Sequence, residues 1–148
     1  MIVLYDSDCG FCRWAMAWAL GRDDRHVLVP VPIQSPLGCE LLVEIPPSER
    51  LRAAHAIAAD GSLSSGGAAA TQVLSVLAPT RALGQVAASV PSVTALLYGV
   101  IAARRTSFGR LVGSQARQRA DALLAATNAT TAAELSARER RGDEVDAR

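Results

Sequence analysis

The feature that most limits how this chain can fold is a short apolar run followed closely by two cysteines at the start of a helical pattern. The run Ile2–Tyr5 predicts a strand, and the residues from Cys9 to about Leu20 predict a helix. Two residues separate Cys9 from Cys12, so both sulfurs fit within one helical turn. Open α/β sheets place their sites at the carboxyl ends of strands. We therefore expect an α/β domain whose site contains both cysteines.

The remaining patterns predict a second strand, a hairpin and further helices. Asp60-Gly61 predicts the hairpin turn, because glycine adopts positive φ without strain. After the first helix, the predicted elements are a strand over Val27–Val31, short helices over Cys39–Ile45 and Pro46–Leu51, hairpin strands over Ala54–Ala58 and Ser62–Ser65, and helices over Ala68–Leu77, Thr80–Ser89 and Pro91 to Arg104 or Arg105. This order is that of an α/β, thioredoxin-like fold (β-α-β, then β-hairpin and helix) with additional C-terminal helices.

The length and the C-terminal composition predict how the chain is divided. A chain of 148 residues is long enough for one domain with its own core. We expect residues 1–112 to form the thioredoxin-like domain with its helical extension. Residues 113–148 are rich in Ala and Arg and favour helix, and we expect a disordered tail from Arg138 because most residues there are charged.

Charge and hydropathy exclude several classes of protein. The formal net charge of +1 argues against a strongly basic nucleic-acid-binding protein. The chain contains no Lys, which excludes Schiff-base and P-loop chemistry. The apolar run from Val90 to Ala103 is shorter than the roughly 20 residues that span a bilayer, and Pro91 and Gly99 interrupt it. We expect a buried or interfacial helix there and no transmembrane span.

The cysteine count and the N-terminal residues bear on the compartment. Three cysteines cannot form a full framework of structural disulfides. Asp6 and Asp8 follow a five-residue apolar start, which is not the pattern of a secretory signal. We therefore expect a cytoplasmic protein, in which a disulfide is more often catalytic than structural.

A Cys-x-x-Cys pair at a helix N-terminus is suited to thiol–disulfide exchange. The unpaired backbone N–H groups of the helix favour a thiolate, and the thiolate is the species that attacks a disulfide. We expect Cys9 to be the nucleophile and Cys12 to resolve the mixed disulfide. Asp6 and Asp8 are candidates for electrostatic tuning or proton transfer, and Phe11 for substrate contact. The predicted partners are a protein or small-molecule thiol or disulfide and an electron-donor thiol system, with no cofactor.

Two other kinds of site use the same residues. The Cys9 and Cys12 thiolates could bind a metal, although structural zinc takes four ligands and the other soft candidates, His26, His55 and Cys39, are isolated. We expect Cys39 to be a small buried hydrophobe rather than a third redox thiol. The motif Asp6-Ser7-Asp8 after an apolar strand also looks like the start of a haloacid-dehalogenase-type phosphatase. Such an enzyme needs a cationic phosphate partner, usually Lys, which this chain lacks.

The segment Tyr5-Asp6-Ser7-Asp8-Cys9-Gly10-Phe11-Cys12 resembles the signature of the DCC family of thiol–disulfide oxidoreductases, which is named for the string Asp8-Cys9-x-x-Cys12. Two later features are also similar: Asp60-Gly61 followed by Gly67-Ala68-x-Ala70, and Tyr98-x-x-Ile101-Ala102 with Arg105. The resemblance implies a thioredoxin-like fold and a redox function. Many such enzymes carry a cis-proline just before the third strand. Here the nearest candidates, Pro46 and Pro47, are better suited to start a helix.

Overall fold

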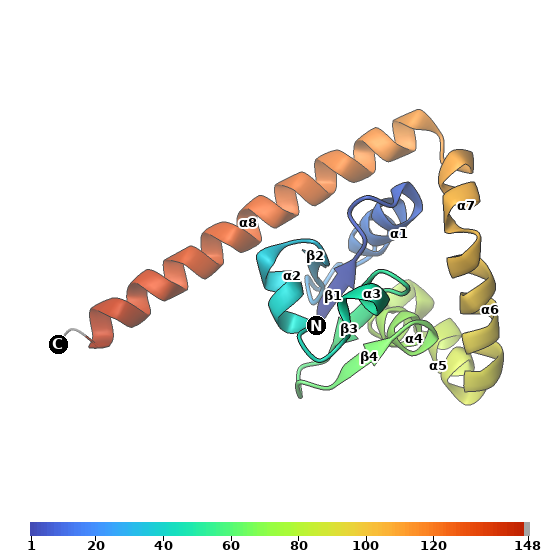
Figure 1. The fold of residues 1–148 in the computed structure, drawn as a ribbon, viewed down its shortest axis with the longest axis horizontal. Helices are drawn as coiled ribbons and strands as arrows, with labels where there is room; N and C mark the ends of the chain where they lie inside the picture. The colour runs from blue at the N-terminus through green and yellow to red at the C-terminus, as the bar shows by residue number, and fades with distance from the viewer. Residues whose placement is uncertain (147–148) are drawn as a thin grey trace.

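A four-stranded mixed sheet forms the centre of the molecule (Figure 1). The computed structural model describes the backbone of residues 1–146 and the side chains of residues 1–105, 107–109 and 111–130. The strand order is β2-β1-β3-β4, with β1 parallel to β2, β1 antiparallel to β3 and β3 antiparallel to β4. The strands are β1 (Ile2–Tyr5), β2 (Val29–Pro32), β3 (His55–Ile57) and β4 (Leu63–Ser65).

Helices surround this sheet and extend it toward the C-terminus. They are α1 (Gly10–Leu20), α2 (Pro36–Leu41), α3 (Pro47–Arg50), α4 (Gly67–Val76), the 3-10 helix η1 (Ala78–Thr80), α5 (Arg81–Ser89), α6 (Pro91–Ala103), α7 (Arg105–Leu111) and α8 (Ser114–Asp146). The long helix α8 lies beside α1, and α5, α6 and α7 follow one another along a second outer edge, which meets α8 where α7 ends (Figure 1). The mixed α/β architecture is compatible with the thioredoxin-like fold that we predicted.

The side chains of β1 alternate between two hydrophobic clusters, one on each face of the sheet. Val3 and Tyr5 pack with residues of α1 and α8 and with Leu77. Leu4, which is fully buried, packs on the other face with Val31 and with two further buried residues, Ile33 and Leu42. This alternation follows from the pleat of a strand, in which successive side chains point to opposite faces. It places β1 at the centre of the fold, and the Cys pair follows just beyond the carboxyl end of this strand.

The first strand and the hairpin form where the sequence predicted them. The hairpin turns at Gly61, which has a φ of +83°. The Asp60 carboxylate accepts hydrogen bonds from the Ser62 N–H (2.9 Å) and the Ser62 hydroxyl (2.6 Å). The turn is therefore held by local interactions, which is why its sequence was sufficient to predict it.

Two predicted elements are shifted along the chain. The second strand begins at Val29 rather than Val27, because the Asp23 carboxylate accepts the Leu28 N–H (2.7 Å) and removes it from strand pairing. The short helix predicted over Cys39–Ile45 is α2, which ends at Leu41. Its start is set by Ser35, whose hydroxyl caps the Gly38 N–H at 3.0 Å, and by a proline in the first turn.

The helix predicted from Pro91 to Arg104 or Arg105 is divided into two. α6 ends at Ala103, and α7 begins at Arg105. α6 has no buried residue, so of the two alternatives expected for this segment, a buried or an interfacial helix, the buried one is wrong. Among the described residues, no single helix is long and apolar enough to cross a bilayer. The segment Ala78–Ser89 and α6 pass that test only as a pair, with a bend of 111° between them.

The long helix α8 attaches to the first strand and the first helix. Ala120 and Leu124 are buried in the cluster that contains Tyr5. The Asn128 side chain donates a hydrogen bond to the Tyr5 hydroxyl (3.3 Å). The α8 backbone continues as helix through Asp146, past Arg138, where we expected a disordered tail; Ala, Glu and Arg all favour helix. Residues 147 and 148 lie outside the described residues, and the division at residue 112 stays a prediction.

Candidate active site

The loop between β1 and α1 is held in place by a glutamine that follows β2. Gln34 donates from its amide to Asp6 Oδ1 (2.7 Å) and accepts, at Oε1, from the Ser7 N–H and hydroxyl at 3.1 and 2.9 Å. Asp6 Oδ1 also accepts the Asp8 N–H (3.0 Å). Gln34 was not among the residues predicted from the sequence. Its position just beyond a strand parallel to β1 was the available signal, because parallel strands end at the same edge of a sheet.

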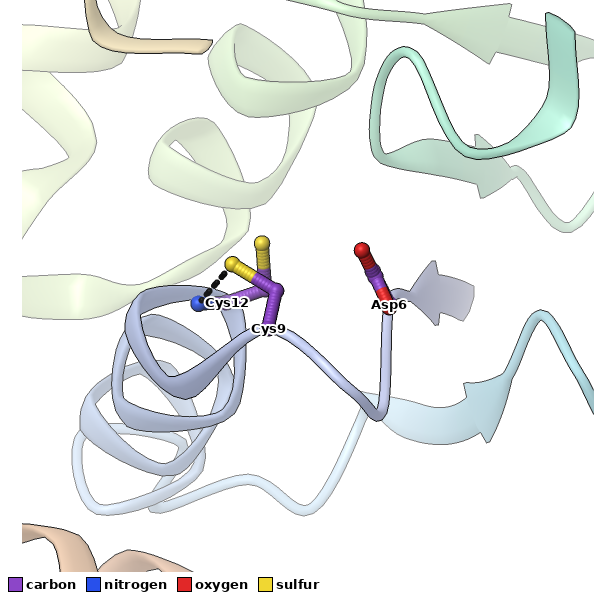
Figure 2. A group of neighbouring side chains, drawn as sticks. All are labelled: Asp6, Cys9 and Cys12. Atoms are coloured by element: carbon purple, nitrogen blue, oxygen red, sulfur yellow. Dashed lines mark hydrogen bonds between the residues drawn. The ribbon is translucent and has the colours of Figure 1, made fainter. Parts of the chain in front are cut away.

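Cys9 occupies the N-cap position of α1, with an extended backbone (φ −89°, ψ 111°). Its Sγ accepts a hydrogen bond from the Cys12 N–H at 3.3 Å, drawn as the dashed line in Figure 2. N-cap side chains are usually oxygen acceptors that satisfy one of the free N–H groups of the first turn. Here a sulfur does so, and a thiolate accepts such a bond more strongly than a thiol.

Cys12 lies one turn further along α1, in a different environment. Burial raises the pKa of the Cys12 thiol well above its usual range. The hydrogen bond to Cys9 and the negative charges of Cys9 and Asp6 raise this pKa further, and the positive charge of Arg105 opposes the change. The two sulfurs therefore differ: one caps the helix, and the other is held as a neutral thiol.

Asp6 lies close to both sulfurs. One carboxylate oxygen of Asp6 and the sulfurs of Cys9 and Cys12 all lie within 4.8 Å of one another, on the same side of the first turn of α1 (Figure 2). The Asp6 side chain is only 12% exposed, and Arg105 Nη1 lies 3.8 Å from its Oδ2. Arg105 also donates to the Leu51 carbonyl (2.7 Å). Asp8, by contrast, is exposed and does not belong to this group.

Two cavities adjoin the Cys pair, and they differ in polarity. Cys9 borders an open pocket of about 440 Å³, whose other lining residues are Asp6, Asp8, Gly10, Arg13, Arg105, Gly109 and Arg117. Cys12 borders an apolar cavity of about 250 Å³ between α1 and α4. Phe11 lines this cavity and also a third, open groove, where its ring lies 5.8 Å from each of Trp14 and Phe108. A molecule in the first pocket meets Cys9 rather than Cys12.

A tyrosine from α6 lies beside the Cys pair. Tyr98 and Cys12 line the same apolar cavity. The Tyr98 hydroxyl accepts the Ala54 N–H at 2.8 Å, just before β3, and burial raises the pKa of Tyr98. All peptide bonds of the described residues are trans. Pro46 precedes α3 and Pro47 begins it, as the sequence predicted.

The other candidate ligands lie apart from this site. The buried His55 uses both ring nitrogens, with Nδ1 2.7 Å from the Ser65 hydroxyl and Nε2 2.9 Å from the Arg50 carbonyl. It is a packing residue. Cys39 is exposed on α2, so the expectation of a buried side chain is wrong: the residue that α2 buries is the neighbouring Gly38. Among the described residues, the sole group of three or more possible metal ligands is Asp6, Cys9 and Cys12.

Comparison with known proteins identifies the family. The family model described as DCC1-like thiol-disulfide oxidoreductase matches residues 3–111, which include β1, the Cys pair and all elements through α7. No curated protein and no solved structure gave a significant match. The matched region covers well over half of the chain and supports a general redox role. The chain therefore belongs to the DCC1-like thiol-disulfide oxidoreductase family.

Proposed function

We propose that the protein exchanges disulfides through Cys9 and Cys12, on a thioredoxin-like fold. The observation that carries this proposal is the difference between the two thiols. Cys9 caps α1 through its sulfur and borders an open pocket, whereas burial and the neighbouring negative charges keep Cys12 protonated. A nucleophile must be accessible and anionic, and a resolving thiol must wait in its neutral form until a mixed disulfide exists.

In the reducing direction, exchange proceeds in two steps and moves two electrons to the substrate. The Cys9 thiolate attacks one sulfur of a substrate disulfide, the substrate S–S bond breaks, and the other substrate sulfur leaves as a thiolate that takes up a proton. The Cys12 thiol then loses its proton and attacks the Cys9 sulfur, which releases the second substrate thiolate. Two electrons have moved to the substrate, and Cys9 and Cys12 form a disulfide. An external thiol donor reduces this disulfide, and the reverse sequence oxidises a dithiol substrate.

Asp6 is the proposed proton acceptor for Cys12. Its carboxylate lies within 4.8 Å of both sulfurs, and it is held there by Gln34 and Arg105. A raised pKa makes Cys12 a poor nucleophile unless a base takes its proton as the sulfur attacks. We assign the exposed Asp8 to the charge of the pocket wall, and Phe11 to contact with the substrate beside the apolar groove.

The direct test is to trap the mixed disulfide in a chain without Cys39, because this exposed third thiol would otherwise form adducts of its own. In the Cys39→Ser background, Cys12→Ser should accumulate a covalent adduct with a model disulfide, and mass spectrometry should map that adduct to Cys9. Cys9→Ser in the same background is the matched control and should trap nothing. An adduct that forms equally well on Cys12, or on neither cysteine, would contradict the proposal.

The role of Asp6 has its own readout. Asp6→Asn should slow the second step and leave the first intact, so the mixed disulfide should persist longer in the presence of Cys12. Asp8→Asn makes the same change in charge at an exposed position and should leave this lifetime close to that of the native protein. Equal lifetimes in the two variants would remove Asp6 from the mechanism.

The alternative function is metal binding by the same residues. The observation in its favour is that Asp6 adds a third potential ligand to the two cysteines. Three ligands are one fewer than structural zinc takes from a protein. Metal analysis of the reduced protein separates the two functions: a metal carrier should contain metal in stoichiometric amount, lose it in Cys12→Ser and form no mixed disulfide.

A further inference from the structure

The surface formed by α5 and α6 has an unusual distribution of apolar side chains. Leu83 and Val86 on α5, and Val90 at the junction with α6, are all exposed and follow one another at intervals of three and four residues. On α6, five exposed side chains repeat in the same way, at intervals of three and four residues: Val93, Leu96, Leu97, Val100 and Ile101. This spacing produces a single face of a helix. In a globular protein such a face is normally turned toward the core.

Here the face points away from the core. Leu96 is 69% exposed and Val86 is 63% exposed, and α6 as a whole has no buried residue. Figure 1 shows α5, α6 and α7 along one outer edge of the molecule, far from α2. We call the eight side chains of α5 and α6 just named the apolar face. Exposed apolar side chains grouped on neighbouring helices in this way mark an interaction site.

The charges around the apolar face indicate what covers it. Residues 82–103 contain no charged side chain, and Arg81 and Arg104 stand at the two ends of this segment. Residues 61–120 contain no Asp or Glu, and of their six arginines Arg81 and Arg104 are the two that flank this segment. An apolar segment that is flanked by arginines and contains no acidic residue complements a partner with an anionic surface and an apolar interior.

We propose that the apolar face docks the protein onto an anionic lipid bilayer. The apolar side chains of α5 and α6 enter the boundary between headgroups and acyl chains, and Arg81 and Arg104 contact the anionic headgroups. Helices of this kind lie in the plane of the membrane interface, and their binding combines buried apolar area with attraction to anionic lipid. The bend of 111° between the two helical segments allows both helices to lie along the membrane surface instead of crossing it.

A second copy of the chain is a poorer occupant. In a two-fold symmetric dimer, the same surface of each protomer meets its counterpart. Two copies of the apolar face would then bring arginines together in a region that has no acidic residue to pair with them. The charge pattern therefore opposes self-association and favours lipid.

The test is co-sedimentation of the full chain with vesicles. We expect binding to vesicles made of equal parts phosphatidylglycerol and phosphatidylcholine, weaker binding at high salt, and little binding to pure phosphatidylcholine. Leu96→Glu should lower partitioning at least about tenfold, because it removes a leucine from the interface and adds repulsion. Val43→Glu is the matched control: Val43 is 73% exposed and lies just after α2, outside α5 and α6, so the same change should leave partitioning unaltered.

Two further measurements complete the test. Arg81→Gln and Arg104→Gln should each lower partitioning about five-fold and should reduce the salt dependence. Light scattering without lipid should show a monomer. The proposal is overturned if neither vesicle binds the protein, if Val43→Glu and Leu96→Glu lose binding equally, or if the protein is a dimer that Leu96→Glu converts to monomers. Because Leu96 does not line the pocket beside Cys9, trapping at Cys9 should be the same in all of these variants.

Discussion

Helix α1, in residues 1–60, and helix α6, in residues 61–120, use apolar side chains in opposite ways. In the first segment, α1 buries Met16, Ala17 and Ala19 against the sheet. In the second segment, α6 is more apolar than α1 and buries no residue. All eight acidic residues of the first 120 lie in the first segment: Asp6, Asp8, Asp23, Asp24, Glu40, Glu44, Glu49 and Asp60. The spacing of apolar residues along a helix thus predicts which side chains share a face. The charges that flank this face indicate which kind of partner it contacts.

The largest effect should separate a leucine of the first segment from one of the second. Leu4 is fully buried in the sheet, so Leu4→Ala should lower the free energy of unfolding by about 2 to 5 kcal/mol. Leu96 is exposed, so Leu96→Ala should change it by less than about 0.5 kcal/mol. Urea unfolding of both variants measures this difference. A large loss in Leu96→Ala would mean that the apolar face is covered in solution, and the contrast between the segments would fail.

The next effect tests how α5 attaches to α4. A Cβ on Gly84 would lie 2.6 Å from both the backbone N and the Oγ of Ser75, so Gly84→Ala should destabilise the protein by about 1 to 3 kcal/mol. Gly99, also inside a helix, has no atom within 4 Å of its would-be Cβ. Gly99→Ala should therefore stabilise the protein by up to about 1 kcal/mol. If both variants change the stability in the same direction, α5 does not pack on α4 as described.

A smaller effect concerns the link between the two segments. Tyr98→Phe removes the acceptor of the Ala54 N–H and should cost about 1 kcal/mol, with faster hydrogen exchange at that amide. Tyr5→Phe is the matched control, because the Tyr5 hydroxyl accepts only a longer bond, 3.3 Å, from a side chain. If exchange at Ala54 is unchanged in Tyr98→Phe, α6 is not anchored through this bond.

The smallest effect lies at Asp60, the last acidic residue before the second segment. Hydrogen bonds from the Ser62 hydroxyl and N–H lower the pKa of Asp60. A lowered pKa stabilises the folded state at pH values above the unfolded pKa, near 3.8, and this contribution is lost as the pH falls through the folded value. Asp60→Asn should therefore be less stable than the native protein at pH 6 and equally stable near pH 2. Thermal unfolding across this range measures the difference, and a constant gap would contradict it.

The parts of the fold that sequence predicted are those held by local interactions. β1, the start of α1 at Cys9 and the Gly61 turn each depend on residues within a few positions of one another. The parts that it missed depend on distant residues. The Asp23 carboxylate delays β2, and the exposure of α6 depends on how the helices pack, which no local pattern contains.

The candidate site divides in the same way. Cys9, Cys12 and Asp6 belong to one motif and were predicted together. Gln34 and Arg105 hold Asp6 although they lie 28 and 99 positions away from it in the sequence. The sheet brings Gln34 to Asp6, and the break between α6 and α7 brings Arg105. Tyr98 and Arg105 are also close in sequence, and one continuous helix from Pro91 to Arg105 was predicted to contain both. They instead lie on successive helices, and each contacts the backbone just before β3.

The Cys9 sulfur that caps α1 links the thermal stability of the protein to its reduction potential. The hydrogen bond from the Cys12 N–H to Cys9 Sγ stabilises the folded dithiol form. If the folded protein is more stable as the dithiol than as the disulfide, the disulfide form accepts electrons more readily. Each tenfold shift of the equilibrium toward the dithiol raises the reduction potential of the Cys9–Cys12 couple by about 30 mV. A dithiol form that melts above the disulfide form would mark the protein as an oxidant, and the opposite order would mark it as a reductant.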